Sequence, residues 1–175
     1  MSDTRTENYA EALLGLARAE GAEAVVADEL YRVAREIDNN VELSTTLSDL
    51  ALPADRRTKV VTDVLGGKVA PATLAALAAV VAAGRADELG AIAQQLAERT
   101  AGDAGQALTT IRTAVALNPD QQQRLAAALE AAAGRPIAPK FLVDPDAVGG
   151  VHAEIGDQVI DGTVRSRLAQ LRELF

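Results

Sequence analysis

Apolar side chains recur every three or four residues through the first hundred residues of the chain, which is the spacing of one face of an α-helix. Tyr9, Leu13 and Leu16, for example, stand at i, i+4 and i+7. Glycine, asparagine and proline interrupt the pattern where helices commonly end or begin. The pattern predicts six helices, over residues 4–19, between Gly21 and Asn39, and over residues 42–50, 53–65, 72–83 and 86–100.

The period of the pattern changes after the glycine-containing segment 102–105. Apolar and β-branched residues alternate along residues 107–117, which predicts a strand. Asn118-Pro119 is a typical helix start, because asparagine caps and proline fits the first turn. Beyond that helix the pattern predicts strands over residues 137–143, 151–155 and 158–160, and a last helix with Val164, Leu168, Leu171 and Phe175 on one face.

The change from a purely helical pattern to a strand-bearing one across a glycine linker predicts two domains. The expected fold class is mostly α, with an N-terminal six-helix bundle over residues 1–105 and a small α+β domain over residues 106–175. Pro136 and Pro139 place the strand 137–143 at a sheet edge, because proline cannot donate to a ladder.

Composition supports a helix-rich core lined by small side chains. Apolar residues make up 49% of the 175, with only two Phe, two Tyr and no Trp, and alanine and leucine are strong helix formers. The absence of cysteine excludes disulfides and thiolate chemistry. The N-terminus lacks the basic and apolar regions of a signal peptide, and the most apolar window, residues 69–83, is too short to span a bilayer, so no direct membrane insertion is expected.

The formal net charge of −8 is concentrated in the first part of the chain. Residues 1–105 carry 10 Lys and Arg against 17 Asp and Glu, a net charge of −7, which leaves −1 for residues 106–175. Nucleic acid requires a cationic face, and an anionic membrane surface attracts basic segments. The charge therefore argues against both as partners.

Two glycine-rich or acidic segments partly match known ligand-binding motifs. Gly66-Gly67-Lys68 follows a helix and lacks both the first glycine and the Ser or Thr of a phosphate loop. Asp144 and Asp146 resemble the start of a calcium loop, but Ile155 stands where the bidentate glutamate belongs. Neither segment supports a cofactor or a metal.

His152 is the only histidine, and on a strand it shares one face with Glu154. A catalytic pair is geometrically possible, and an enzyme that uses Asp144, His152 and Glu154 on a small acyl or phosphoryl substrate is a third hypothesis for the function. Proton transfer also requires a pocket that shifts a pKa, which a two-stranded hairpin does not offer. An exposed hairpin histidine is the favoured interpretation.

The helix 72–83 is almost entirely Ala, Leu and Val. A helix that is apolar on every side is expected to be buried on every side. Two interpretations stand side by side. The other five helices wrap it completely, or part of it joins the first helix in a groove for an amphipathic helix of another protein.

The sequence resembles the delta subunit family of rotary ATP synthase, known in mitochondria as the oligomycin-sensitivity-conferring protein. The resemblance rests on Tyr9-Ala10 with Leu13, on Gly84-Arg85, and on the C-terminal segment VGGVHAEIGDQVIDGTVRSRLAQL. Thr163 stands where the family often has serine, and either hydroxyl can cap a helix. The likeness extends over essentially the whole chain.

The resemblance implies a non-catalytic stator subunit in the peripheral stalk of the proton-transporting ATP synthase, at the cytoplasmic face of the membrane. The first domain would bind the N-terminal helix of an alpha subunit, and the second the C-terminal end of the stalk b subunit. The groove implied for alpha lies between the first and fifth helices and comprises Tyr9, Ala12, Leu13, Leu16, Ala75, Ala78, Ala79 and Ala82. The motif residues implied to be structural are Gly84, Arg85, Gly149, Gly150, Gly156, Asp161, Gly162 and Thr163.

A free-standing helical adaptor that binds an amphipathic helix of some other protein is the alternative function. Copurification with alpha and b subunits distinguishes the two.

Overall fold

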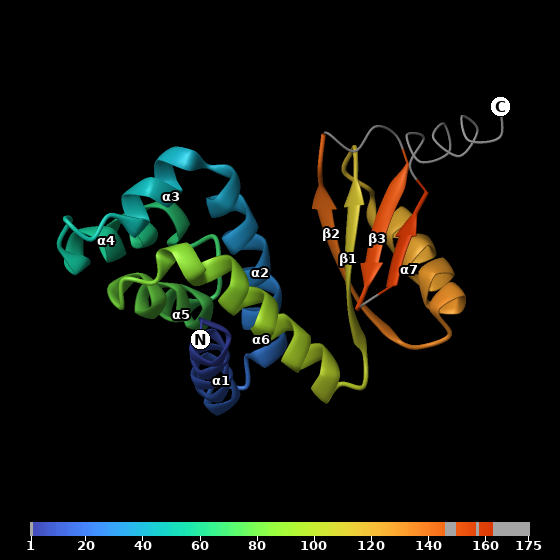
Figure 1. Cartoon of the computed structure of the whole chain (residues 1–175), viewed down its shortest axis with the longest axis horizontal. Helices are drawn as coiled ribbons and strands as arrows, with labels where there is room; N and C mark the ends of the chain where they lie inside the picture. The colour runs from blue at the N-terminus through green and yellow to red at the C-terminus, as the bar shows by residue number, and fades with distance from the viewer. Residues whose placement is uncertain (1, 146–149, 157, 163–175) are drawn as a thin grey trace. The chain divides into compact units, whose positions relative to one another are not determined.

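The computed structural model describes residues 2–145, 150–156 and 158–162. These residues form a mostly helical protein with a small four-stranded sheet (Figure 1). The chain divides into two compact units, Met1–Thr100 and Ala101–Phe175. Each unit has its own hydrophobic core.

The predicted helices of the first hundred residues are all present. They are α1 Ser2–Ala19, α2 Glu23–Asn39, α3 Val41–Ser48, α4 Ala54–Leu65, α5 Pro71–Ala82 and α6 Leu89–Asp103, with a short 3-10 helix, η1 Ala86–Glu88, before α6.

The limits predicted for the sixth helix were wrong at both ends. Its expected start at Ala86 is the 3-10 turn, in which the Glu88 N–H bonds to the Arg85 carbonyl at 3.0 Å. Its end lies inside the segment interpreted as a linker, because Gly102 continues the helix. The helix stops where Gly105 adopts a φ of 69°, and the Gln106 N–H then bonds back to the Ala101 carbonyl at 2.8 Å.

The core of the first unit consists of the apolar stripes of its helices. Its large members include Leu13, Val26, Leu30, Ile37, Leu47, Val61, Leu77, Val80, Leu89, Ile92 and Leu96. Full burial of one such side chain contributes roughly 1.5–3 kcal/mol relative to exposure. The packing of these stripes is therefore the main stabilising term of the unit.

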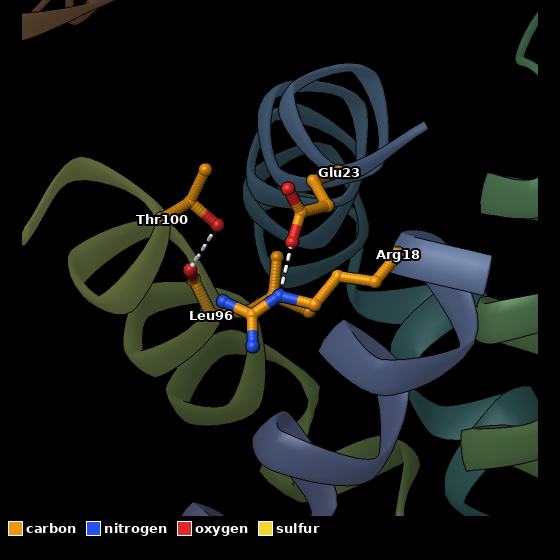
Figure 2. Close-up of polar contacts among 4 residues, drawn as sticks. All are labelled: Arg18, Glu23, Leu96 and Thr100. Carbon is orange, nitrogen blue, oxygen red and sulfur yellow. Dashed lines mark hydrogen bonds and ion pairs between the residues drawn. The ribbon is translucent and has the colours of Figure 1, made fainter. Parts of the chain in front are cut away.

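Polar contacts support the ends of helices in the first unit. Arg18, in the last turn of α1, pairs with Glu23, in the first turn of α2 (Figure 2). In α6 the Thr100 hydroxyl donates to the Leu96 carbonyl at 2.9 Å. These contacts are local supports around the apolar core.

The second unit contains a mixed sheet in the order β2-β1-β3-β4. Its elements are β1 Ala107–Thr113, α7 Pro119–Ala133, β2 Ile137–Val143, β3 Val151–Ile155 and β4 Gln158–Asp161. β1 and β2 are parallel and joined through α7, whereas β3 is antiparallel to both β1 and β4. The edge position predicted for residues 137–143 is confirmed, since β2 ends the sheet.

Helix α7 packs on one face of this sheet (Figure 1). The shared core contains Ile111, Leu129, Ile137, Ala153 and Ile155. The predicted helix start is confirmed, because the Asn118 side chain accepts from the Gln121 N–H at 2.9 Å and the Gln121 side chain accepts from the Asn118 N–H at 3.0 Å.

The first strand is shorter than predicted. It ends at Thr113, not at Leu117, because the Thr113 hydroxyl donates to the Val115 carbonyl at 2.8 Å in a local turn that competes with the ladder. The last predicted helix, with Val164, Leu168, Leu171 and Phe175, lies outside the described residues.

Candidate protein-binding site

Helix α5 carries no charged side chain and has two unlike faces. Thr73, Ala76, Leu77, Val80 and Val81 are buried in the first unit. Of the four alanines predicted to line a groove, Ala75, Ala79 and Ala82 are exposed and Ala78 is half-buried. This exposure argues against the interpretation in which the other five helices wrap α5 completely, because in the part of the chain that the structure describes they leave these alanines uncovered.

The predicted groove residues of α1 differ in their exposure to solvent. Ala12 is exposed, and Leu16 keeps 62% of its area exposed, which is unusual for a leucine on an apolar stripe. Leu13 is only 4% exposed and belongs to the core that also contains Leu77 of α5. Tyr9 is half-buried. The predicted groove residues of α1 thus include one core residue, and they offer Ala12 and Leu16 as free surface.

A cation–π contact joins α1 to the segment that follows α5. The Arg85 guanidinium carbon lies 4.7 Å from the centroid of the Tyr9 ring. The same guanidinium pairs with Glu88 at 2.5 Å, and only 16% of the Arg85 side chain is exposed. The predicted groove residue Tyr9 therefore also tethers the C-terminal end of α5.

The preceding residue, Gly84, allows this contact. Its φ is 72°, a conformation that side chains with a Cβ rarely adopt. The Arg85 N–H then bonds back to the Val80 carbonyl at 3.1 Å, which ends the helix. A Cβ on Gly84 would also stand 2.9 Å from Leu50 Cδ2. This geometry supports the structural role that the family resemblance implied for Gly84 and Arg85.

The N-terminal end of α5 is held by a residue that the sequence analysis missed. Glu29 Oε2, on α2, accepts hydrogen bonds from the Ala70 N–H at 2.8 Å and from the Thr73 hydroxyl at 2.7 Å. The only signal in the sequence is the lack of a polar capping residue before Pro71. Nothing local identifies Glu29, 41 residues away from Ala70 in the chain, as the substitute.

Two ion pairs involve charged residues of α1. Glu11 of α1 pairs with Arg99 of α6 at 3.7 Å, and Arg18 pairs with Glu23. Ala12 and Leu16 of α1 and the exposed alanines of α5 are themselves uncharged. Small apolar side chains between charged neighbours are suited to a partner helix that brings its own bulky apolar face.

The second unit contains the predicted pair of His152 and Glu154. His152 Nε2 lies 3.1 Å from Glu154 Oε1, and Arg112 Nη2 lies 3.7 Å from the same oxygen. The prediction of an exposed histidine was wrong, because the His152 side chain is partly buried and keeps only 28% of its area exposed. The reason is that β3 is an inner strand between β1 and β4. In the register of β1 and β3, Arg112 lies opposite His152.

The described residues of the C-terminal motif lie at the turns of β3 and β4. Gly150 precedes β3, and Gly156 connects β3 to β4 with a φ of 56°. Asp161 is the exposed last residue of β4, and the Gly162 N–H bonds to the Val151 carbonyl at 2.9 Å. Gly149 and Thr163 lie outside the described residues.

An uncharged helix face that is exposed to solvent is a common feature of helical domains that bind other proteins. The chain matches the family described as ATP synthase delta (OSCP) subunit over residues 6–175. It belongs to that family.

Curated relatives include ATP synthase subunit delta of Nocardia farcinica (strain IFM 10152), which is 37% identical over 172 residues, covering 98% of this chain and 64% of the relative. ATP synthase subunit delta of Parafrankia sp. (strain EAN1pec) is 38% identical over 90% of this chain and 57% of its own length. ATP synthase subunit b-delta of Mycobacterium sp. (strain KMS) is 35% identical over 90% of this chain and 36% of its own length. The chain spans between about a third and two thirds of these relatives.

The fold recurs in a solved structure of the Toxoplasma gondii mitochondrial ATP synthase hexamer. The TM-score is 0.55 at 20% identity, and the match covers 97% of this chain and 96% of the other. Among the described residues, no helix is long and apolar enough to cross a bilayer.

Proposed function

We propose that this chain is a peripheral-stalk subunit of a rotary, proton-translocating ATP synthase. It links the catalytic head to the b-subunit stalk and resists the torque of the rotor. The observation that carries the proposal is the family match over residues 6–175. The role is structural and not catalytic, and it places the chain peripherally at the cytoplasmic face of the membrane.

The first domain, a six-helix bundle of residues 1–105, would bind the N-terminal helix of the alpha subunit. Its binding surface would be the predicted groove residues of α1 and α5. The exposure of Ala12, Leu16, Ala75, Ala79 and Ala82 supports this assignment. The acidic charge of the domain favours a partner segment that carries basic side chains.

The second domain, residues 106–175, would bind the C-terminal end of the b subunit. Support comes from the relatives named ATP synthase subunit b-delta, whose name joins the two subunits. Both domains are needed for a link that transmits force from the stalk to the head. Neither contact requires an activated side chain.

Titration calorimetry of the full chain with a synthetic peptide of the alpha-subunit N-terminus tests the first contact. Ala79→Asp is expected to weaken binding by about a hundredfold or more, because it places a charge in an apolar interface. The matched control is Ala127→Asp, which alters an exposed alanine of α7, and it is expected to bind like the unmodified chain. Equal affinities of all three proteins would contradict the groove, and an unmodified chain that does not bind would count against the stator assignment.

A further inference from the structure

Helix α5 begins without a cap of its own. Its N-cap residue is Ala70, which has no side-chain hydrogen bond to offer, and Pro71 follows at the first position. The first four N–H positions of a helix have no partner within the helix. In many helices a capping box meets part of this demand, in which a residue at the third position bonds back to the N-cap N–H.

In α5 the carboxylate of Glu29, on α2, accepts the hydrogen bond that a capping-box residue would otherwise accept. Glu29 Oε2 accepts from the N–H of the N-cap residue Ala70 and from the hydroxyl of Thr73, which is the third residue of α5. The Thr73 side chain is completely buried, so its hydroxyl has no alternative in bulk water. Glu29 also brings negative charge to the positive end of the helix dipole. One side chain of α2 therefore accepts both from the N-cap N–H and from the buried hydroxyl in the first turn of α5.

The consequence concerns the exposed alanines. Ala75 lies two residues beyond Thr73, directly after the turn that Glu29 holds. The other end of α5 is held through Arg85 on the Tyr9 ring. These two contacts anchor the two ends of α5, and the exposed alanines Ala75, Ala79 and Ala82 lie between them.

We infer that Glu29 is a positioning residue for partner binding: by capping α5 from α2, it holds the helix in the geometry that the partner helix requires. Glu29 does not touch the partner and acts through α5. This inference rests on the proposed function, since the partner is the N-terminal helix of alpha. It adds a specific carboxylate, outside the two groove helices, on which affinity depends.

The test compares Glu29→Ala, Glu29→Gln and Thr73→Val with the control Glu36→Ala, which removes an exposed glutamate from the same helix. Each full-length variant is titrated with the alpha N-terminal peptide. Glu29→Ala is expected to raise Kd about tenfold, the usual scale of a lost N-cap. Glu29→Gln keeps an acceptor oxygen and is expected to recover most of the affinity, whereas Glu36→Ala is expected to leave Kd unchanged.

Hydrogen exchange provides a second reading on the same proteins. Loss of the cap is expected to speed amide exchange at Ala70 and Leu74 while the interior of α2 stays protected. Thr73→Val nearly preserves the side-chain shape and removes one donor, so it serves if Glu29→Ala does not fold. Its expected effect on Kd is smaller than that of Glu29→Ala, and combining these two changes is expected to be non-additive because the two residues share a hydrogen bond.

The outcomes distinguish a failure of the Glu29 inference from a failure of the proposed function. If the unmodified chain binds the peptide and the Glu29 and Thr73 variants bind equally well, the inference is wrong and the proposed function stands. If Glu29→Gln is as weak as Glu29→Ala, acceptance of the two hydrogen bonds is not the reason, and the inference is again overturned. If the unmodified chain itself fails to bind, the proposed function fails and takes the inference with it.

Discussion

Helices α5 and α7 look alike in sequence and are held in different ways. Both begin with proline and are rich in alanine. Helix α7 supplies its own capping box from Asn118 and Gln121, whereas α5 is capped by Glu29 from another helix. The comparison shows that α7 is specified locally, and α5 depends on residues far away in the chain.

The two helices also differ in their charge. Asp120 and Arg124 of α7 form an exposed pair one turn apart, while α5 has no charged residue at all. A helix whose outer face is meant to meet water is usually charged there. The uncharged outer face of α5 is therefore the stronger candidate for a surface that another protein covers.

The largest expected effect is a loss of stability in the first unit when a core side chain of α5 is truncated. Leu77→Ala in α5 removes a side chain with no exposed area and is expected to destabilise the first unit by about 2–5 kcal/mol. Denaturant unfolding followed by hydrogen exchange in each unit measures the effect. The second unit, which has a separate core, is expected to keep its stability. Equal loss in both units would contradict their independence.

A smaller effect is expected at the start of α7. Asn118→Ala removes the local cap and is expected to reduce the stability of the second unit by about 1 kcal/mol. Binding of the alpha peptide is expected to be unaffected, in contrast to the Glu29 variants. Calorimetry and unfolding on the same preparation check both statements. A loss of peptide affinity in Asn118→Ala would remove the distinction between the two helices.

Local signals account for the parts of the fold that the sequence predicted well. Asn118-Pro119 identified the start of α7, and Pro136 and Pro139 identified an edge strand, because these residues act on their own backbone. The recurrence of apolar residues every three or four positions likewise predicted the helices of the first hundred residues, because that spacing is a property of each segment alone.

Long-range pairings account for most of what was missed. The expected exposure of His152 assumed a two-stranded hairpin, whereas β1 pairs with β3 and brings Arg112 to Glu154. Glu29 reaches residues 41 and 44 positions away, and no periodicity encodes that distance. The exposure of Ala75, Ala79 and Ala82 likewise depends on which neighbours pack around α5, although the helix itself was predicted from its composition.

The central proposal is that the chain holds alpha and b together and so keeps the catalytic head from turning with the rotor. The most direct measurement is ATP-driven proton pumping in membranes stripped of this subunit and supplied with purified protein. The account predicts that pumping is lost on stripping, returns with the unmodified chain and with Ala127→Asp, and returns poorly with Ala79→Asp. Full coupling in stripped membranes, or equal recovery with all three proteins, would contradict it.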